Sequence, residues 1–233
     1  PAMTEEQALA AIRVGMELAA ECKEKGYQIL ATGEMGIGNT TTAAAVTAAL
    51  TGTSVEKIVG RGAGLSDAGL ARKREVVQEA LLQYGFASEL ITPNVPNGRT
   101  SENANIVQKE RTLRVLSCVG GLDIAAMAGV FIGGAMARLP VVIDGVISAV
   151  AAMVAENLVP GVKAYMIPSH KSKEPAADIV FQALDMEPVI QGELALGEGT
   201  GAVMLFGLLD MAMSLYEKPT TFADIAVEQY RRF

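Results

Sequence analysis

The chain has 233 residues, 50% of them hydrophobic, which is enough to bury the core of one domain. Its formal net charge of −7 argues against nucleic-acid binding, which requires a basic surface. Its two cysteines, Cys22 and Cys118, fit neither a metal-ligand spacing nor a disulfide framework, which indicates reduced thiols in a cytoplasmic protein. The longest apolar run, 124–137, is shorter than the roughly 20 residues of a membrane span, and the first residues show no leader pattern, so we predict no membrane segment.

Hydrophobic periodicity, interrupted by glycine and proline, predicts alternating helices and short strands. Strands are predicted where a short apolar run ends at a turn, at 27–32, 141–143 and 163–168. Helices are predicted where the apolar spacing is helical, at 4–25, 40–50, 67–84, 101–118, 122–137, 147–156, 175–184, 201–216 and 221–230. Residues 55–59 fit either a strand or a helical turn, while 60–64 and 91–100 are predicted loops.

This alternation is typical of an α/β domain with a mostly parallel sheet flanked by helices, in a Rossmann-like arrangement. In such sheets the ligand lies at the carboxyl ends of the strands. The turns at Gly33, Asp144 and Ser169 each follow a predicted strand. We therefore expect these three turns to share one edge of the sheet.

A first glycine-rich turn, residues 33–42, places Glu34 among glycines directly before a predicted helix. Glycine lets the backbone approach a ligand, and free N–H groups at a helix start attract anions. The turn lacks the G-x-G-x-x-G spacing, and Asn39-Thr40 stands where a P-loop requires lysine and a hydroxyl residue, which disfavours NAD and ATP. Glu34 is interpreted as a proton acceptor or hydrogen-bonding group beside a bound anion; a tight helix–strand connection without a ligand is the alternative.

A second glycine-rich turn, residues 196–202, places Glu198 between two glycines. A glutamate in the first turn of a helix is favoured by the helix dipole without any catalytic role. The flanking Gly197 and Gly199 weaken that explanation, because glycine is a poor helix residue. Two such turns predict a site for a phosphorylated small molecule with a carboxylate at the reacting end.

Other polar residues give weaker signals. Lys73 stands in a charged run, which predicts an exposed position on a solvated helix face. His170, the only histidine, has no acidic neighbour in the sequence and is a poor candidate for a general base. Asp123 and Asp144 each begin an apolar segment, where capping of the following helix is as plausible as catalysis. From these residues alone we predict an enzyme that binds a phosphosugar or a nucleotide.

Taken in order, several segments resemble the nicotinate-nucleotide:dimethylbenzimidazole phosphoribosyltransferase family, namely 1–4, 33–41, 60–64, 120–127, 141–145, 169–170 with 174–176, and 196–202. The two glycine–glutamate turns are the most specific of them. The resemblance implies transfer of the phosphoribosyl group of nicotinate mononucleotide to 5,6-dimethylbenzimidazole, which gives α-ribazole 5′-phosphate and nicotinate. It implies no metal and no cofactor.

The resemblance also implies roles for individual residues. Glu198 would be the catalytic base. The substrate-binding residues would be Glu34, Met35, Gly36, Ile37, Gly38, Asn39, Thr40, Gly62, Lys73, Ser169, His170, Leu196 and Gly197. Lys73 would reach the nucleotide phosphate, in contrast to the exposed position that its charged run predicts, and Ser169 with His170 would complete the rim of the site.

The family is homodimeric, which implies a homodimer here, with the two small-molecule substrates as the other partners. The small residues around Gly129, Gly133 and Gly134 allow close helix packing. This packing would lie either at the contact between subunits or inside the core.

Family members carry an N-terminal segment ahead of the Pro-Ala-Met-Thr motif, with which this chain begins. We therefore expect one α/β phosphoribosyltransferase domain over 1–233, whose C-terminal helices belong to a smaller helical domain lacking its N-terminal part. Since that part supplies some of the benzimidazole pocket, we expect nicotinate mononucleotide to bind more readily than it turns over. Two alternatives are a phosphoribosyltransferase with another acceptor, such as adenine or a phenol, and a non-catalytic nucleotide-binding protein.

Overall fold

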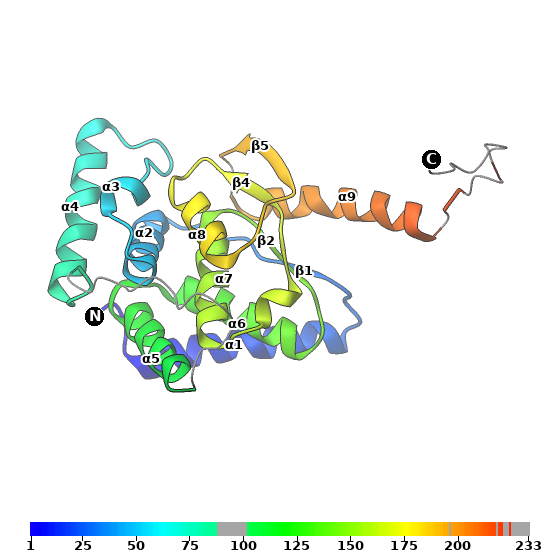
Figure 1. The fold of residues 1–233 in the computed structure, drawn as a ribbon, viewed down its shortest axis with the longest axis horizontal. Coiled ribbons are helices and arrows are strands. Elements are labelled where there is room, and N and C mark those ends of the chain that lie inside the picture. The colour runs from blue at the N-terminus through cyan, green and yellow to red at the C-terminus, as the bar shows by residue number, and fades with distance from the viewer. Residues whose placement is uncertain (88–101, 196, 218, 221–223, 225–233) are drawn as a thin grey trace, which may run out of the picture.

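The computed structural model describes residues 1–87, 102–195, 197–217, 219, 220 and 224 (Figure 1). Its helices are α1 (Glu5–Glu24), α2 (Asn39–Thr51), α3 (Val55–Ile58), α4 (Asp67–Gln83), α5 (Glu102–Val119), α6 (Leu122–Met136), α7 (Val146–Leu158), the 3-10 helix η1 (Val162–Tyr165), α8 (Ala176–Leu184) and α9 (Thr200–Glu217). Its strands are β1 (Leu30–Ala31), β2 (Val141–Ile143), β3 (Met166–Pro168), β4 (His170–Ser172) and β5 (Ile190–Leu194).

The central sheet is short and parallel. Its strand order is β1-β2-β3, and Val141 of β2 pairs with Leu30 on one side and Met166 on the other. All of β2 is buried, as expected for a β-branched strand covered on both faces. A second parallel pair joins β4 to β5. Parallel strands among helices confirm the predicted α/β class.

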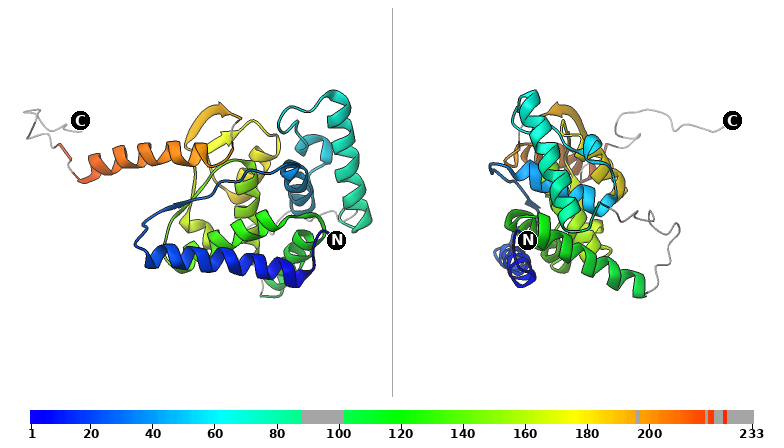
Figure 2. Two further views of the ribbon diagram at one scale, coloured as in Figure 1. Left: turned by 180° about the vertical axis from the view of Figure 1, so that it is seen from behind. Right: turned by 90° about the vertical axis from the view of Figure 1, so that its left-hand side faces the viewer.

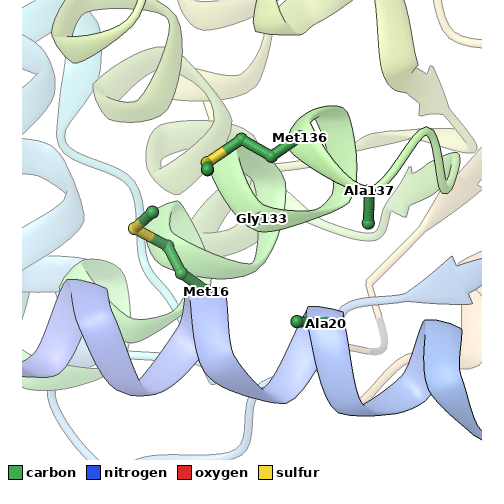
Figure 3. Close-up of a pocket in the computed structure, with 5 residues that line it drawn as sticks. All are labelled: Met16, Ala20, Gly133, Met136 and Ala137. Carbon is green, nitrogen blue, oxygen red and sulfur yellow. The ribbon is translucent and has the colours of Figure 1, made fainter.

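Helices α1 and α6 approach so closely that only glycine fits between them. A Cβ atom built on Gly15 would lie 1.9 Å from the Ala126 carbonyl oxygen, and one on Gly129 would lie 1.9 Å from that of Ile12. Gly133 faces the Cα atom of Met16 in the same way. Gly129 and Gly133 therefore pack against α1 of the same chain. Figure 3 shows a small apolar pocket between these helices, lined by Met16, Ala20, Gly133, Met136 and Ala137, none of which belongs to the glycine turns.

Some predicted elements differ from the structure. The predicted strand at 163–168 is wrong in its first half, where η1 forms, because the Glu156 carboxylate accepts hydrogen bonds from the N–H groups of Gly161 (2.9 Å) and Lys163 (2.8 Å) and winds the segment. The strand at 27–32 is shorter than predicted, the segment 55–59 forms helix α3 over its first four residues, and neither β4 nor β5 was predicted. The predicted loop 91–100, and the helix 221–230 except Asp224, lie outside the described residues.

Helix α9 projects away from the rest of the described molecule in Figure 1 and in the left view of Figure 2. Many of its apolar side chains are exposed, namely Val203, Met204, Leu208, Met211, Met213, Leu215 and Tyr216. Among the described residues, no helix combines the length and apolarity required to cross a bilayer.

Candidate active site

The carboxyl ends of the three central strands form the edge at which the site is built. Thr32 follows β1, Asp144 follows β2 and Ser169 follows β3, and the strands are parallel neighbours. Backbone pairing continues beyond the strands, since the N–H of Thr32 donates to the Val142 carbonyl at 3.1 Å and that of Ser169 donates to Ile143 at 3.0 Å. The prediction that these turns share one edge is confirmed.

The two glycine-rich turns touch each other through their backbones. A Cβ atom built on Gly33 would lie 2.7 Å from the Gly199 nitrogen and 2.9 Å from the Glu198 carbonyl carbon, so only glycine allows this approach. A Cβ atom on Gly197 would lie 3.6 Å from the Glu34 carbonyl oxygen. The fold thus brings the backbones of Glu34 and Glu198 together from opposite ends of the chain.

Glu198 is exposed and lies just before α9, which begins at Thr200, rather than in its first turn. Its φ of +65° is in the left-handed region, which costs a residue with a side chain roughly 1–2 kcal/mol. The Asp144 carboxylate fixes this turn through two hydrogen bonds. Its Oδ2 accepts from the Gly199 N–H at 3.0 Å, and its Oδ1 accepts from the Ala202 N–H at 3.1 Å. The surrounding structure therefore imposes the unusual conformation of Glu198.

Asp144 is 2% exposed and caps α9 rather than α7, the helix that it precedes in sequence. Its carboxylate also lies 3.9 Å from His170 Nδ1, so the expectation that His170 lacks an acidic partner is wrong. The sequence could not indicate this pair, because the chain brings the two residues together only through the β2–β3 pairing.

Ser169 and His170 are fully buried beneath the turns rather than open on the rim. The Ser169 hydroxyl and His170 Nδ1 are hydrogen-bonded at 2.9 Å. Burial lowers the pKa of His170 below its usual range, and the nearby Asp144 opposes part of this lowering. A neutral imidazole that packs against Gly201 at the start of α9 supports the second turn from inside the protein.

Glu34 stands at the same edge and is half-buried. Its carboxylate accepts a hydrogen bond from the Asn39 side chain, while burial, and secondarily the negative charge of Asp123, raise its pKa above the usual range. Met35 and Ile37 beside it are 75% and 107% exposed, so no described side chain covers them. This end of the turn presents a carboxylate next to open apolar surface.

Lys73 lies at the other end of the first turn. Its ammonium donates to Thr40 Oγ1 at 2.8 Å and to the Gly60 carbonyl at 3.0 Å, and the residue is only 6% exposed. The exposed position predicted from its charged run is wrong, because Lys73 shares the buried stripe of α4 with Val77 and Leu81, at spacings of four and eight residues. Burial lowers the pKa of Lys73, and Glu174 opposes part of this effect.

The structure assembles most of the predicted site residues around residues 33–40, which touch the Glu198 turn at one end and Lys73 at the other. The side chains or backbones that meet there are those of Glu34, Asn39, Thr40, Gly62, Lys73, Gly197 and Glu198. Gly36 lies against the Glu34 carboxylate and Gly38 begins α2, whereas Leu196 lies outside the described residues. No sequence pattern predicts a site role for Glu174, and the sequence is compatible with either a capping or a catalytic role for Asp144.

A family model described as phosphoribosyltransferase (DBI_PRT) matches residues 1–227. The nicotinate-nucleotide--dimethylbenzimidazole phosphoribosyltransferases of Acetivibrio thermocellus and Clostridium acetobutylicum are 44% and 43% identical over 99% of this chain, which spans 60% and 59% of their length. A crystal structure of CobT from Thermus thermophilus superposes with a TM-score of 0.81 at 37% identity, over 99% of this chain and 62% of that one. The chain belongs to the DBI_PRT family of phosphoribosyltransferases.

Proposed function

We propose that this chain carries the transfer site of a nicotinate-nucleotide:dimethylbenzimidazole phosphoribosyltransferase. The reaction moves the phosphoribosyl group of nicotinate mononucleotide to 5,6-dimethylbenzimidazole and gives α-ribazole 5′-phosphate and nicotinate. The names of the similar proteins support this reaction. The observation that carries the proposal is the position of residues 33–40 between a buried lysine and an exposed glutamate.

Lys73 is the proposed partner of the substrate phosphate. An ammonium has three N–H donors, and Thr40 and Gly60 accept two of them, so one is left for a phosphate oxygen. The start of α2 at Gly38, which has no side-chain cap, adds favourable backbone dipoles on the same side. Glu34 and Asn39 then lie along the ribose.

Glu198 is the proposed general base. The bond between C1′ and the nicotinate nitrogen breaks, and its electron pair returns to a pyridinium nitrogen that needs no protonation. One nitrogen of dimethylbenzimidazole attacks C1′ from the opposite face, and the N–H proton of the other nitrogen passes to the Glu198 carboxylate. The exposed position of Glu198, in a turn that touches the turn bearing the exposed apolar side chains Met35 and Ile37, suits a base that meets an aromatic acceptor.

The test is to incubate the protein with nicotinate mononucleotide and 5,6-dimethylbenzimidazole and to detect α-ribazole 5′-phosphate by mass spectrometry. Glu198→Gln should lower the rate by about 10²–10⁴-fold, the usual contribution of a general base. Glu217→Gln, at the far end of α9, is the matched control and should retain the parent rate.

Other results favour other functions. Nucleotide binding without product from any acceptor would favour a non-catalytic nucleotide-binding protein. Product with adenine or a phenol, but not with dimethylbenzimidazole, would favour the alternative acceptor class.

The proposal includes the organisation of the protein. We infer a cytoplasmic homodimer in which residues 1–233 contribute one α/β domain and α9 belongs to a smaller helical domain. The free thiols of Cys22 and Cys118 and the exposed apolar side chains of α9 support this view. Light scattering after size exclusion should give twice the chain mass of 24.3 kDa, whereas the mass of one chain would argue against the dimer.

A further inference from the structure

Glu174, just before α8, holds the glycine loop 60–64 by a long-range hydrogen bond. The N–H of Gly62 donates to Glu174 Oε1 at 2.8 Å, although the two residues are 112 positions apart. A Cβ atom built on Gly60 would lie 2.3 Å from Glu174 Oε2 and 2.6 Å from Pro175 Cδ. The loop can lie against this carboxylate only because residue 60 is glycine.

The same loop borders the lysine that we assign to the phosphate. The Gly60 carbonyl accepts from Lys73 Nζ at 3.0 Å. A Cβ atom on Gly62 would lie 3.7 Å from Lys73 Nζ and 2.8 Å from Thr40 Oγ1. The Gly62 N–H therefore belongs to the donors around Lys73, and a carboxylate of this chain occupies it.

A phosphate group bound at Lys73 would compete with that carboxylate. Backbone N–H groups of glycine loops are strong donors to phosphate oxygens, and the Gly62 N–H becomes available only if Glu174 releases it. If Glu174 keeps the bond, its negative charge faces the phosphate at short range in a partly desolvated site, where like charges repel strongly. Both routes weaken the binding of phosphate.

We propose that Glu174 is a built-in competitor for the phosphate subsite and thereby weakens, by a similar factor, the binding of every ligand that places a phosphate there. Inorganic phosphate has only the phosphate contacts with which to displace the carboxylate, so it binds weakly. A nucleotide adds contacts from its ribose and base and binds despite the competition. This inference rests on the proposed function, which assigns the phosphate to Lys73.

The test measures inorganic phosphate binding by titration calorimetry at constant ionic strength. Glu174→Gln keeps an oxygen that can accept from Gly62 but removes the charge, and it should tighten binding about tenfold. Glu174→Ala also frees the N–H and should tighten binding at least as much. Asp178→Asn removes a charge from the same helix at an exposed ion pair with Lys171, so it should leave the affinity within twofold. In these Glu174 variants the affinity for nicotinate mononucleotide should rise by the same factor as the affinity for phosphate, because both ligands displace the same carboxylate.

Lys73→Met separates failure of this inference from failure of the proposed function. Unchanged phosphate binding in Lys73→Met would mean that the phosphate lies elsewhere and would reject the proposed subsite. Loss of binding in Lys73→Met, together with unchanged or weaker binding in Glu174→Gln, would overturn the role of Glu174 and leave the proposed function in place. Thermal unfolding identifies any variant that is not folded; if Glu174→Ala is not, the milder Glu174→Gln decides.

Discussion

The two ends of the candidate site are built in different ways. At the proposed phosphate end, the buried ammonium of Lys73 donates to the Thr40 hydroxyl and to the Gly60 carbonyl, and the backbone N–H of Gly62 in the same loop donates to the Glu174 carboxylate. At the reacting end, contact is made by the backbones of two glycine turns, and the Glu198 carboxylate remains exposed. This contrast indicates that the proposed phosphate end is held by hydrogen bonds inside the protein, whereas the orientation of the proposed base depends on one strained turn.

Replacing the central cation should have the largest effect on the phosphate end. Lys73→Met should weaken binding of nicotinate mononucleotide by about 10–150-fold, since a hydrogen bond to a charged group contributes roughly 1.5–3 kcal/mol. The substitution removes two hydrogen bonds, which contribute about 1 kcal/mol each to stability. It also removes the cost of burying a charged ammonium, so the free energy of unfolding should change little. Calorimetry and urea unfolding measure both quantities.

Arg72→Met is the control for that prediction. It removes the same charge from the same helix, but at an exposed ion pair with Glu75, so nucleotide affinity should change less than about threefold. Equal losses in the two variants would mean that Lys73 acts only through the general field of the helix.

Relieving the strained turn should separate stability from activity at the reacting end. Glu198→Gly removes the side chain from a left-handed residue and should raise the free energy of unfolding by about 0.5–1 kcal/mol, after the greater freedom of glycine in the unfolded chain is subtracted. The same variant should lose the transfer reaction. Urea unfolding and the mass-spectrometric assay test the two parts.

Arg138→Gly provides the matched comparison, because Arg138 has a φ of +51° and precedes β2, toward the opposite end of that strand from Asp144. It should be stabilised to a similar extent while product formation is retained. A Glu198→Gly protein that is less stable than the parent would indicate that the Glu198 side chain, and not Asp144 alone, holds the turn.

The weakest of these effects should be on the pH dependence of stability, through His170 beneath the second turn. Because its pKa is lowered in the folded protein, the unfolded chain takes up a proton near pH 6.5 while the folded protein does not. The contribution of His170 to the free energy of unfolding is therefore fully present above about pH 6.5 and falls as the pH drops toward the folded pKa. The slope for one proton is at most about 1.4 kcal/mol per pH unit.

His170→Asn removes the only histidine and should flatten this decline between pH 7.5 and 5.5 in urea unfolding. Its loss of packing should appear as a constant offset at all pH values. An unchanged slope would show that protonation of His170 does not cause the decline.

Much of the fold follows from local sequence patterns. The Thr4–Gln7 capping box begins α1 as predicted, and Gly26, with a φ of +86°, follows its end. The apolar run of β2 and the helical spacing of α4, α6 and α7 place these elements within a few residues. These features depend on neighbours within one or two turns of chain, so the order of the residues is sufficient to predict them.

The chemistry of the site was only partly predictable. The glycine–glutamate turns signal a close backbone approach by their composition, and the resemblance points to Glu198 and Lys73. The 3-10 helix η1 was missed because the Glu156 carboxylate, and not periodicity, winds it. The burial of Lys73 was missed because a charged run dominated the interpretation, although Val77 and Leu81 share its face.

Residue order alone therefore specifies the helices, the strand–turn–helix units and the two turns that bear carboxylates. Only the tertiary structure shows that Asp144 caps α9, where the nearest hydrogen-bonded residue, Gly199, is 55 positions away in sequence. It also shows that Glu174 accepts a hydrogen bond from the backbone N–H of Gly62, in the loop before α4. Local hydrogen bonding and side-chain spacing are encoded by near neighbours. A polar partner more than 50 residues away is chosen by how strands pair and helices pack, and this choice converts two glycine turns into one site.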